Sequence, residues 1–295
     1  MRPGRLAAAG ALLLLTAPGC RRDSPAPGAG DPLAEARALV DERRFDEAIA
    51  SLPDGGDAEA LYLLGRAWAG KAETAPVPTP VPGTTAPAHP LKAEEARALA
   101  FYERAVATRP DHAAAHLAIA ELLAPHALVA ATPRGGGAAT AGDVVSVDRV
   151  LRSYGQAIQA DPAGAVAVEA MIRFATRTGR VAEADGGFQE LVRRRREDPG
   201  LLVRYGDFLA GPGGNADGAL ARYAQALIWR PDDSATRLKM ADIHLTAAAG
   251  LLTQQQYAAA EARLREARRF VADPASAPAA RLRELEGRLR EIRGR

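Results

Sequence analysis

The chain contains three nine-residue blocks that share one pattern: Tyr102–Pro110 (YERAVATRP), Tyr154–Pro162 (YGQAIQADP) and Tyr223–Pro231 (YAQALIWRP). Each block consists of an aromatic residue, two residues, an alanine, an aliphatic residue, three residues and a proline. The aromatic, alanine and aliphatic positions fall at i, i+3 and i+4, so they form one stripe of an α-helix. The alanine lets a neighbouring helix approach closely, and the proline ends the helix because its ring clashes with the preceding turn.

The spacing of the blocks indicates an internal repeat. Pro162 and Pro231 lie 69 residues apart, which is two units of about 34 residues. Pro110 and Pro162 lie 52 residues apart, which is one unit plus an insertion. We therefore expect a repeat domain over residues 33–274 made of six helix pairs, at 33–52, 57–70 with 91–108, 113–124 with 144–160, 164–178 with 181–197, 199–210 with 216–229, and 234–249 with 254–271.

These pairs resemble tetratricopeptide repeats (TPRs). In that family the first helix of each pair has a bulky apolar residue followed by Gly or Ala. Here such steps are Leu64-Gly65, Ile119-Ala120, Tyr205-Gly206 and Met240-Ala241. The resemblance implies an all-α fold, an α-solenoid of about six TPR-like helix pairs with a C-terminal capping helix.

Helix ends and the C-terminal segment follow from local sequence. Gly179 is expected to end a helix, and Ser234 is expected to cap the start of one. Residues 275–295 are expected to form the capping helix, because a solenoid needs a polar-backed helix at its end. Its apolar stripe comprises Leu282, Leu285, Leu289 and Ile292. The alternative is that this stripe mediates dimerisation.

Residues 1–19 have the features of a secretion signal. Arg2 and Arg5 precede an apolar run at 6–15 that is too short to span a bilayer, and Cys20 is the only cysteine of the chain. The segment resembles a bacterial lipoprotein signal peptide, in which the cysteine is lipidated and becomes the first residue of the mature protein. The alternative is a plain secretory signal with an incidental cysteine.

The segment after the signal cannot form a core. Residues 20–32 are rich in Pro, Gly and charge, and they predict a flexible tether. In lipoproteins an aspartate directly after the cysteine often retains the protein at the inner membrane. Because Arg21 occupies that position, the resemblance implies a lipid anchor in the bacterial outer membrane, with the body facing the periplasm.

Two insertions, at 72–90 and 125–143, interrupt the period between the helices of adjacent repeats. The first is rich in proline, which favours an extended backbone, and the second contains three consecutive glycines. Equivalent loops of stacked repeats emerge on one edge, so the insertions are expected side by side. They either contact a partner or are neutral variation in length.

The composition excludes several functions. The formal net charge is +2 and falls to zero without Arg2 and Arg5, so nothing favours nucleic acid as a partner. No nucleophile-elbow or phosphate-loop motif occurs. We therefore expect no enzymatic activity, no cofactor and no small-molecule substrate.

His112 and His116 have a spacing that suits metal ligands. They lie at i and i+4 near a helix start, a spacing that can hold a metal ion. No third ligand is fixed by spacing, since His126 falls in a predicted loop. A metal- or small-ligand-binding periplasmic lipoprotein that uses this pair is therefore the rival hypothesis, and no metal site is predicted.

In TPR proteins the first helices line an inner groove, and the resemblance implies that this groove binds an envelope protein or peptide. The groove is expected to contain Tyr62, Arg66, Leu117, Glu121, Glu169, Arg173, Arg177, Val203, Asp207, Leu238 and Asp242. This mixture of charges and apolar residues suits a partner recognised by hydrogen bonds and a few apolar anchors. The resemblance implies an accessory role in envelope assembly, secretion, pilus or polysaccharide-export machinery, without choosing among them.

Overall fold

The computed structural model describes residues 31–53, 56–74, 91–130 and 145–294. Over these residues the chain forms thirteen α-helices and no strand, so the predicted all-α fold is confirmed. The helices are α1 (Pro32–Asp41), α2 (Phe45–Ser51), α3 (Ala58–Thr74), α4 (Ala93–Thr108), α5 (Ala113–Ala130), α6 (Val147–Ala160), α7 (Val166–Arg177), α8 (Val181–Arg194), α9 (Pro199–Ala210), α10 (Ala216–Trp229), α11 (Ser234–Thr253), α12 (Tyr257–Phe270) and α13 (Ala277–Arg293).

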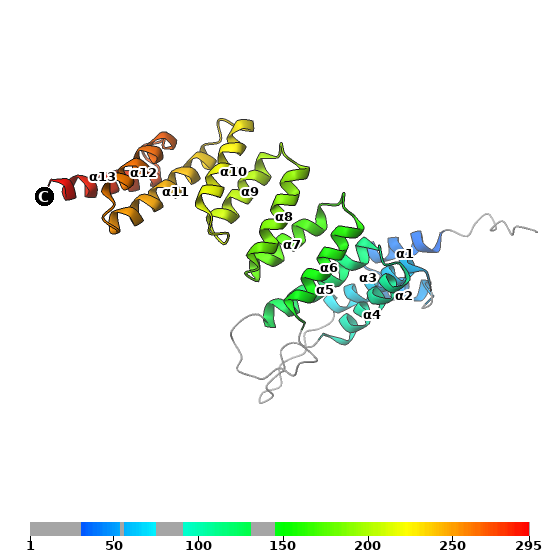
Figure 1. Ribbon diagram of the computed structural model, residues 1–295. Coiled ribbons are helices and arrows are strands. Elements are labelled where there is room, and N and C mark those ends of the chain that lie inside the picture. The colour runs from blue at the N-terminus through cyan, green and yellow to red at the C-terminus, as the bar shows by residue number, and fades with distance from the viewer. Residues whose placement is uncertain (1–30, 54–55, 75–90, 131–144, 295) are drawn as a thin grey trace, which may run out of the picture.

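Consecutive helices pack as six pairs, from α1 with α2 to α11 with α12, and each pair contacts the next one. Figure 1 shows the pairs stacked side by side in one elongated row, with α1 and α13 at opposite ends. The predicted α-solenoid of six TPR-like helix pairs is thus the architecture of the described chain. A solenoid has no single central core, so each pair depends on its neighbours for burial of its apolar faces.

The three sequence blocks supply the close contacts within the pairs. Their tyrosines and alanines are all buried: Tyr102, Ala105, Tyr154, Ala157, Tyr223 and Ala226. A Cβ atom added to Gly206 would lie 2.4 Å from a ring carbon of Tyr223, and one added to Gly65 would lie 2.5 Å from Tyr102. The small residue of the predicted bulky–small step therefore leaves the space that the tyrosine ring of the second helix fills.

The apolar stripe of α13 closes the C-terminal end of the solenoid. Leu282, Leu285 and Leu289 are buried, and they share one cluster with side chains of α11 and α12. The predicted capping helix is confirmed. Because α11 and α12 already cover these leucines, they are not an open surface for dimerisation.

Two predictions about helix ends have different outcomes. Gly179 ends α7 with a φ of 71°, and the N–H of Arg180 donates to the carbonyl of Ala175 at 2.8 Å, as a helix cap requires. Ser234 is the first residue of α11 and not its N-cap. Asp233 is the cap, because its carboxylate accepts both the N–H and the hydroxyl of Thr236, at 3.1 and 2.7 Å.

The predicted starts of both insertions are wrong. Helix α3 continues to Thr74, so residues 72–74 are helical. Helix α5 continues through Pro125 to Ala130, although proline removes one helical hydrogen bond. Burial of Leu123 and Ala127 on either side of Pro125 holds this part of α5 against the core.

The remaining residues of both insertions lie outside the described part of the chain. The predicted signal peptide, Cys20 and most of the tether lie outside it as well. The described chain begins with Asp31, whose carboxylate accepts the N–H of Leu33 at 3.0 Å and caps α1. None of the described helices combines the length and apolar character that a bilayer span requires.

Candidate functional site

An open trough of about 1080 Å³ runs across α5, α7 and α9 in the middle of the solenoid. Side chains of the second helices α6 and α8 reach its floor between these first helices. A second hollow of about 760 Å³, lined by residues from α1 to α5, shares Glu121 and Pro125 with the trough. The two hollows therefore lie next to each other, on either side of Glu121 and Pro125 of α5.

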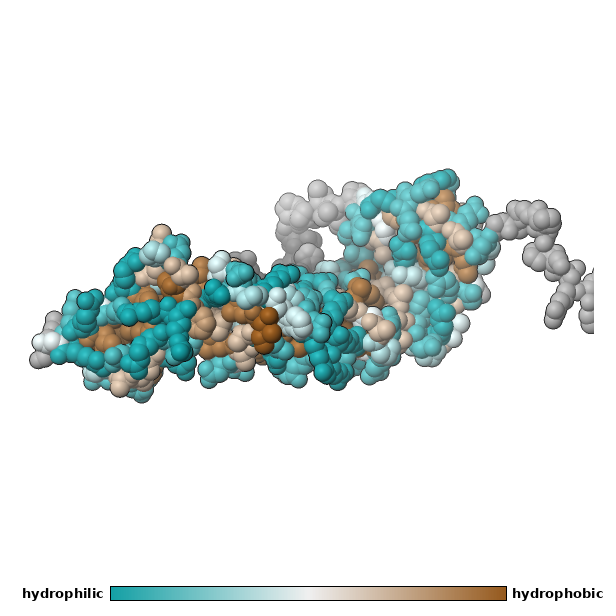
Figure 2. Space-filling model, turned by 90° about the horizontal axis from the view of Figure 1, so that it is seen from above, coloured by the Kyte–Doolittle hydropathy of each residue, from teal (hydrophilic) through white to brown (hydrophobic). Residues whose placement is uncertain are grey.

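The floor of the trough is apolar. Phe174, Phe188, Phe208, Leu191 and Tyr154 line it. The Phe188 ring lies 5.2 Å from the Phe208 ring and stacks on Tyr205 at 5.1 Å, measured between ring centroids. Aromatic rings held this way form a rigid apolar surface that can bury a ligand side chain at little entropic cost. On the face drawn in Figure 2, apolar residues appear in short stretches between hydrophilic ones.

The rim of the trough is charged. Three basic and three acidic side chains line it: Arg173, Arg177, Arg204, Glu121, Glu169 and Asp207. All six come from the first helices, because the groove-facing positions of stacked helices form one row. The rim therefore has no excess of positive or negative charge. Any selection among ligands depends on where the individual charges lie.

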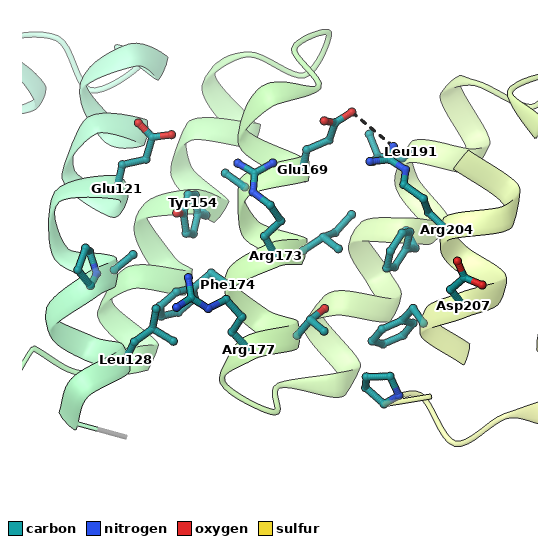
Figure 3. Close-up of a pocket in the computed structure, with 18 residues that line it drawn as sticks. Glu121, Leu128, Tyr154, Glu169, Arg173, Phe174, Arg177, Leu191, Arg204 and Asp207 are labelled. Atoms are coloured by element: carbon teal, nitrogen blue, oxygen red, sulfur yellow. Dashed lines mark ion pairs between the residues drawn. The ribbon is translucent and has the colours of Figure 1, made fainter. Parts of the chain in front are cut away.

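Two of the rim acids are neutralised within the protein. Glu169 lies 3.3 Å from the guanidinium of Arg195 and 3.9 Å from that of Arg204 (Figure 3). Asp207 accepts a hydrogen bond from the Lys239 ammonium at 2.6 Å and another from the Tyr223 hydroxyl at 2.7 Å. These carboxylates are held in place and have little capacity for a ligand.

Three rim charges have no such partner. Glu121, Arg173 and Arg177 form no ion pair with any described residue, and all three are exposed. Partial burial raises the pKa of the Glu121 carboxyl, and the charge of Arg173 opposes that rise. Burial also raises the pKa of the Tyr154 phenol, to about 12, so its hydroxyl remains a hydrogen-bond donor at neutral pH.

The structure places the predicted groove residues in several environments. Five of them line the trough: Glu121, Glu169, Arg173, Arg177 and Asp207. Arg66 lines the second hollow, where its guanidinium lies 3.0 Å from Asp41. Asp242 lies 2.7 Å from Arg281 of the capping helix.

The apolar residues predicted for the groove serve packing. Leu117 and Val203 are half-buried against the core clusters, and Leu238 is also half-buried. Tyr62 packs against the rings of Tyr102 and His112, at centroid distances of 6.0 and 5.1 Å. None of these four residues lines the trough.

Sequence reasoning missed the floor of the trough and Arg204. The segment Phe188–Val192 (FQELV) repeats the aromatic and aliphatic positions of the three blocks, but it has Leu191 where they have alanine. In this pair the small residue is on the second helix and the large one on the first, because Gly187 of α8 packs on Ile172 of α7. Leu191 in place of alanine was the sequence feature that could have indicated a different contact in the α7–α8 pair.

The histidines act in local structure. His112 is buried, its Nδ1 accepts the N–H of Ala115 at 3.3 Å, and its Nε2 lies 3.4 Å from Glu59. His116 Nε2 lies 2.8 Å from the carbonyl oxygen of Pro110. The two ring systems thus cap and close the turn before α5.

His126 was predicted to lie in a loop, and that prediction is wrong. It belongs to α5, where its Nε2 lies 3.3 Å from Glu95. Among the described residues no group of three potential ligands is arranged to hold a metal ion.

Comparisons with known proteins find a similarity of fold and no similarity of sequence to a described family. No protein-family model matches the chain, and no curated protein matches it. The solved structure of YrrB, described as a TPR protein with an unusual peptide-binding site, has 14% identity and a TM-score of 0.44, covering 81% of this chain and 97% of YrrB.

Two further solved structures have the same kind of likeness. A tetratricopeptide repeat protein from Parabacteroides merdae has 13% identity and a TM-score of 0.44, covering 89% of this chain and 85% of its own. MamA from Desulfovibrio magneticus has 16% identity and a TM-score of 0.43, covering 69% and 98%. Because all three TM-scores are below 0.5, the assignment as an α-solenoid rests on the helix pairs of this chain.

Proposed function

We propose that the protein is a non-enzymatic scaffold that binds a segment of another protein in the trough. The observation behind this proposal is the open trough of about 1080 Å³ with an aromatic floor and a charged rim. A rigid apolar floor supplies affinity, and charges placed around it supply specificity.

The cellular setting is a further part of the proposal. The sequence features of residues 1–19 and the single Cys20 favour a lipid anchor in the bacterial outer membrane, with the solenoid in the periplasm. A partner from the cell envelope follows from that setting. On this proposal the trough is held near the membrane and recruits an envelope protein during assembly, secretion or export.

A plug in the trough tests the binding function. Thr176 is half-buried and lines the trough, so Thr176→Trp should fill part of it and reduce capture of cross-linked partners from native membranes. Thr246→Trp is the matched control, since Thr246 is exposed on α11 and lies away from the trough lining. Partners recovered equally with both variants would show that another surface binds them.

Cys20→Ala tests the anchor separately. The variant should move from the membrane pellet to the soluble periplasm if Cys20 is lipidated. Unchanged pelleting together with an unchanged mass would contradict lipidation and would leave the trough proposal as it stands.

A further inference from the structure

The chain contains the same two groove positions in two different repeats. Glu121 and Asp207 each follow the small residue of a bulky–small step on a first helix. Tyr154 and Tyr223 each begin the sequence block of the second helix that follows. An acid and a tyrosine therefore face each other in the α5–α6 pair and in the α9–α10 pair.

The α9–α10 position is satisfied within the protein. The Tyr223 hydroxyl donates to Asp207 at 2.7 Å, and the Lys239 ammonium, from the next first helix, contacts both carboxylate oxygens at 2.6 Å. Every polar group of this trio has a partner. A ligand could bind here only by breaking these hydrogen bonds.

The α5–α6 position is not satisfied by any described residue. Tyr154 is 3% exposed and lines the trough, yet its hydroxyl forms no hydrogen bond with the described chain. Glu121 has no ion pair there, and α7 contributes two arginines, Arg173 and Arg177, which have none either. Figure 3 shows both arginines extending from α7 into the space in front of Tyr154 and Leu128.

The Tyr154 ring is buried, but its hydroxyl is not among the buried polar atoms and has no partner in the described chain, so it opens into the trough and is free to bond a ligand. Arg173 and Arg177 supply only donors, the Tyr154 hydroxyl can donate or accept, and Glu121 supplies the one carboxylate of the set. An anionic group with several acceptor lone pairs complements such a set.

We propose that Tyr154, Arg173 and Arg177 form a subsite for an acidic side chain, Asp or Glu, within the partner segment that the trough binds. This inference rests on the proposed function. Both arginines and the phenol donate to the ligand carboxylate. The aromatic floor next to Phe208 accepts a bulky apolar residue of the same segment.

The occupant is an internal side chain and not a chain end. The trough is open, and the second hollow lies on the other side of Glu121 and Pro125, so a bound segment has room to continue beyond the subsite. The Glu121 carboxylate on that side accepts from a backbone N–H or a basic side chain of the segment, which fixes the direction of the segment.

The test uses a displayed library of random twelve-residue peptides selected on the purified full chain. Selected peptides should have Asp or Glu at a constant distance from an aromatic or aliphatic residue. The acidic preference should disappear when the same library is selected on Arg173→Gln/Arg177→Gln. A matched control is Arg152→Gln/Arg288→Gln, which removes two exposed arginines outside the trough and should keep the preference.

A synthetic copy of the most enriched peptide then reports on the hydroxyl. Its Kd should rise roughly tenfold or more with Arg173→Gln/Arg177→Gln and about fivefold with Tyr154→Phe. Tyr223→Phe, the same change at the satisfied position, should leave the Kd unchanged. A peptide with Gln in place of the acidic residue should bind the wild-type protein with a Kd raised by the same factor as the arginine variant shows. On the arginine variant this change in the peptide should raise the Kd no further.

The possible failures are separable. If no peptide is enriched, or if Thr176→Trp selects the same peptides, the trough does not bind a segment and the proposed function fails with the inference. If peptides bind in the trough without an acidic residue, or if they retain it on the arginine variant, the acidic subsite is wrong and the binding function stands. Enrichment of acids only at the free C-terminus would overturn the assignment to an internal side chain.

Discussion

The groove-facing charges differ between the C-terminal repeats and the middle of the solenoid. Toward the C-terminus Asp207 and Asp242 each have a partner two helices further along the chain, since Asp207 of α9 contacts Lys239 of α11 at 2.6 Å and Asp242 of α11 contacts Arg281 of α13 at 2.7 Å. In the middle, Glu121 and Arg173 have no ion-pair partner among the described residues, and they stand above an aromatic floor.

This difference arises partly within the pair, where Tyr223 donates to Asp207 but Tyr154 makes no such bond, and partly from the neighbouring pair. The acid and tyrosine positions are the same in the α5–α6 and α9–α10 pairs, but only the second is followed by a lysine that reaches back. A repeat framework thus produces equivalent positions, and contacts within the pair and from the next first helix together decide whether the acid at each one is paired. Binding capacity is therefore expected where the neighbour leaves the charges unpaired.

The largest expected effect on stability concerns the C-terminal end of the solenoid, which α13 covers. Leu285 is 3% exposed and belongs to the cluster that α13 shares with α11 and α12. Leu285→Ala should lower the free energy of unfolding by about 2–5 kcal/mol, because it leaves a cavity in that cluster. Chemical unfolding measures the loss, and Ile292→Ala, at a half-exposed position of the same stripe, should cost less. Equal losses would contradict the role of α13 as a packed cap.

A smaller loss is expected from overpacking a helix contact. Ala226 is 2% exposed inside the α9–α10 pair, so Ala226→Leu should cost roughly 1–3 kcal/mol. Ala224→Leu is the control, because Ala224 is exposed two positions earlier on the same helix. A melting temperature equal to that of the parent would mean that the pair can separate, and the rigidity assumed for the trough walls would fail.

Removing one hydroxyl compares the two equivalent positions directly. Tyr223→Phe deletes the hydrogen bond to Asp207 and should cost about 0.5–1.5 kcal/mol. Tyr154→Phe deletes a hydroxyl that has no described partner, so its cost in the absence of ligand should be close to zero. A loss for Tyr154→Phe as large as that for Tyr223→Phe would show that the middle position is also satisfied within the protein.

The sequence predicted the framework because its determinants are local. The tyrosine, alanine and proline of each block fix a helix, its contact face and its end within nine residues. The bulky–small steps then fix where the tyrosine packs, as Gly206 and Tyr223 show. These features are the same in each repeat, so they can be recognised without knowledge of the three-dimensional arrangement.

The candidate site depends on relations between repeats, which the sequence did not reveal. The interruption of the helical pattern at Pro125 suggested an insertion, yet burial of Leu123 and Ala127 extends α5 to Ala130. The floor residues Phe188 and Phe208 meet only after the pairs are stacked. Whether Glu121 is paired depends on how far side chains from the next helix reach, and no periodicity encodes that distance.

The smallest expected effect is a pH dependence of stability that arises from His244 in the C-terminal helix pair. His244 is 6% exposed, its ring stacks on Phe270, and its Nδ1 has no partner among the described residues. Burial and the nearby charge of Arg263 lower the pKa of His244, while Glu266 and Asp217 oppose that shift. The folded protein therefore holds this ring neutral under conditions in which the unfolded chain already binds a proton.

The sign of the effect follows from this difference in protonation. Above the ordinary pKa of 6.5 both states are neutral, and as the pH falls below it the unfolded state gains protons first, so the free energy of unfolding decreases. His244→Leu places an apolar side chain of roughly similar size at this position and removes the titration, so the stability of the variant should fall less between about pH 8 and pH 5.5 in urea unfolding. Some slope should remain, because burial and Arg109 also lower the pKa of His112 near α5. A variant with the same slope as the parent would show that His244 is protonated equally in both states, and that the α11–α12 contact is more open than its packing indicates.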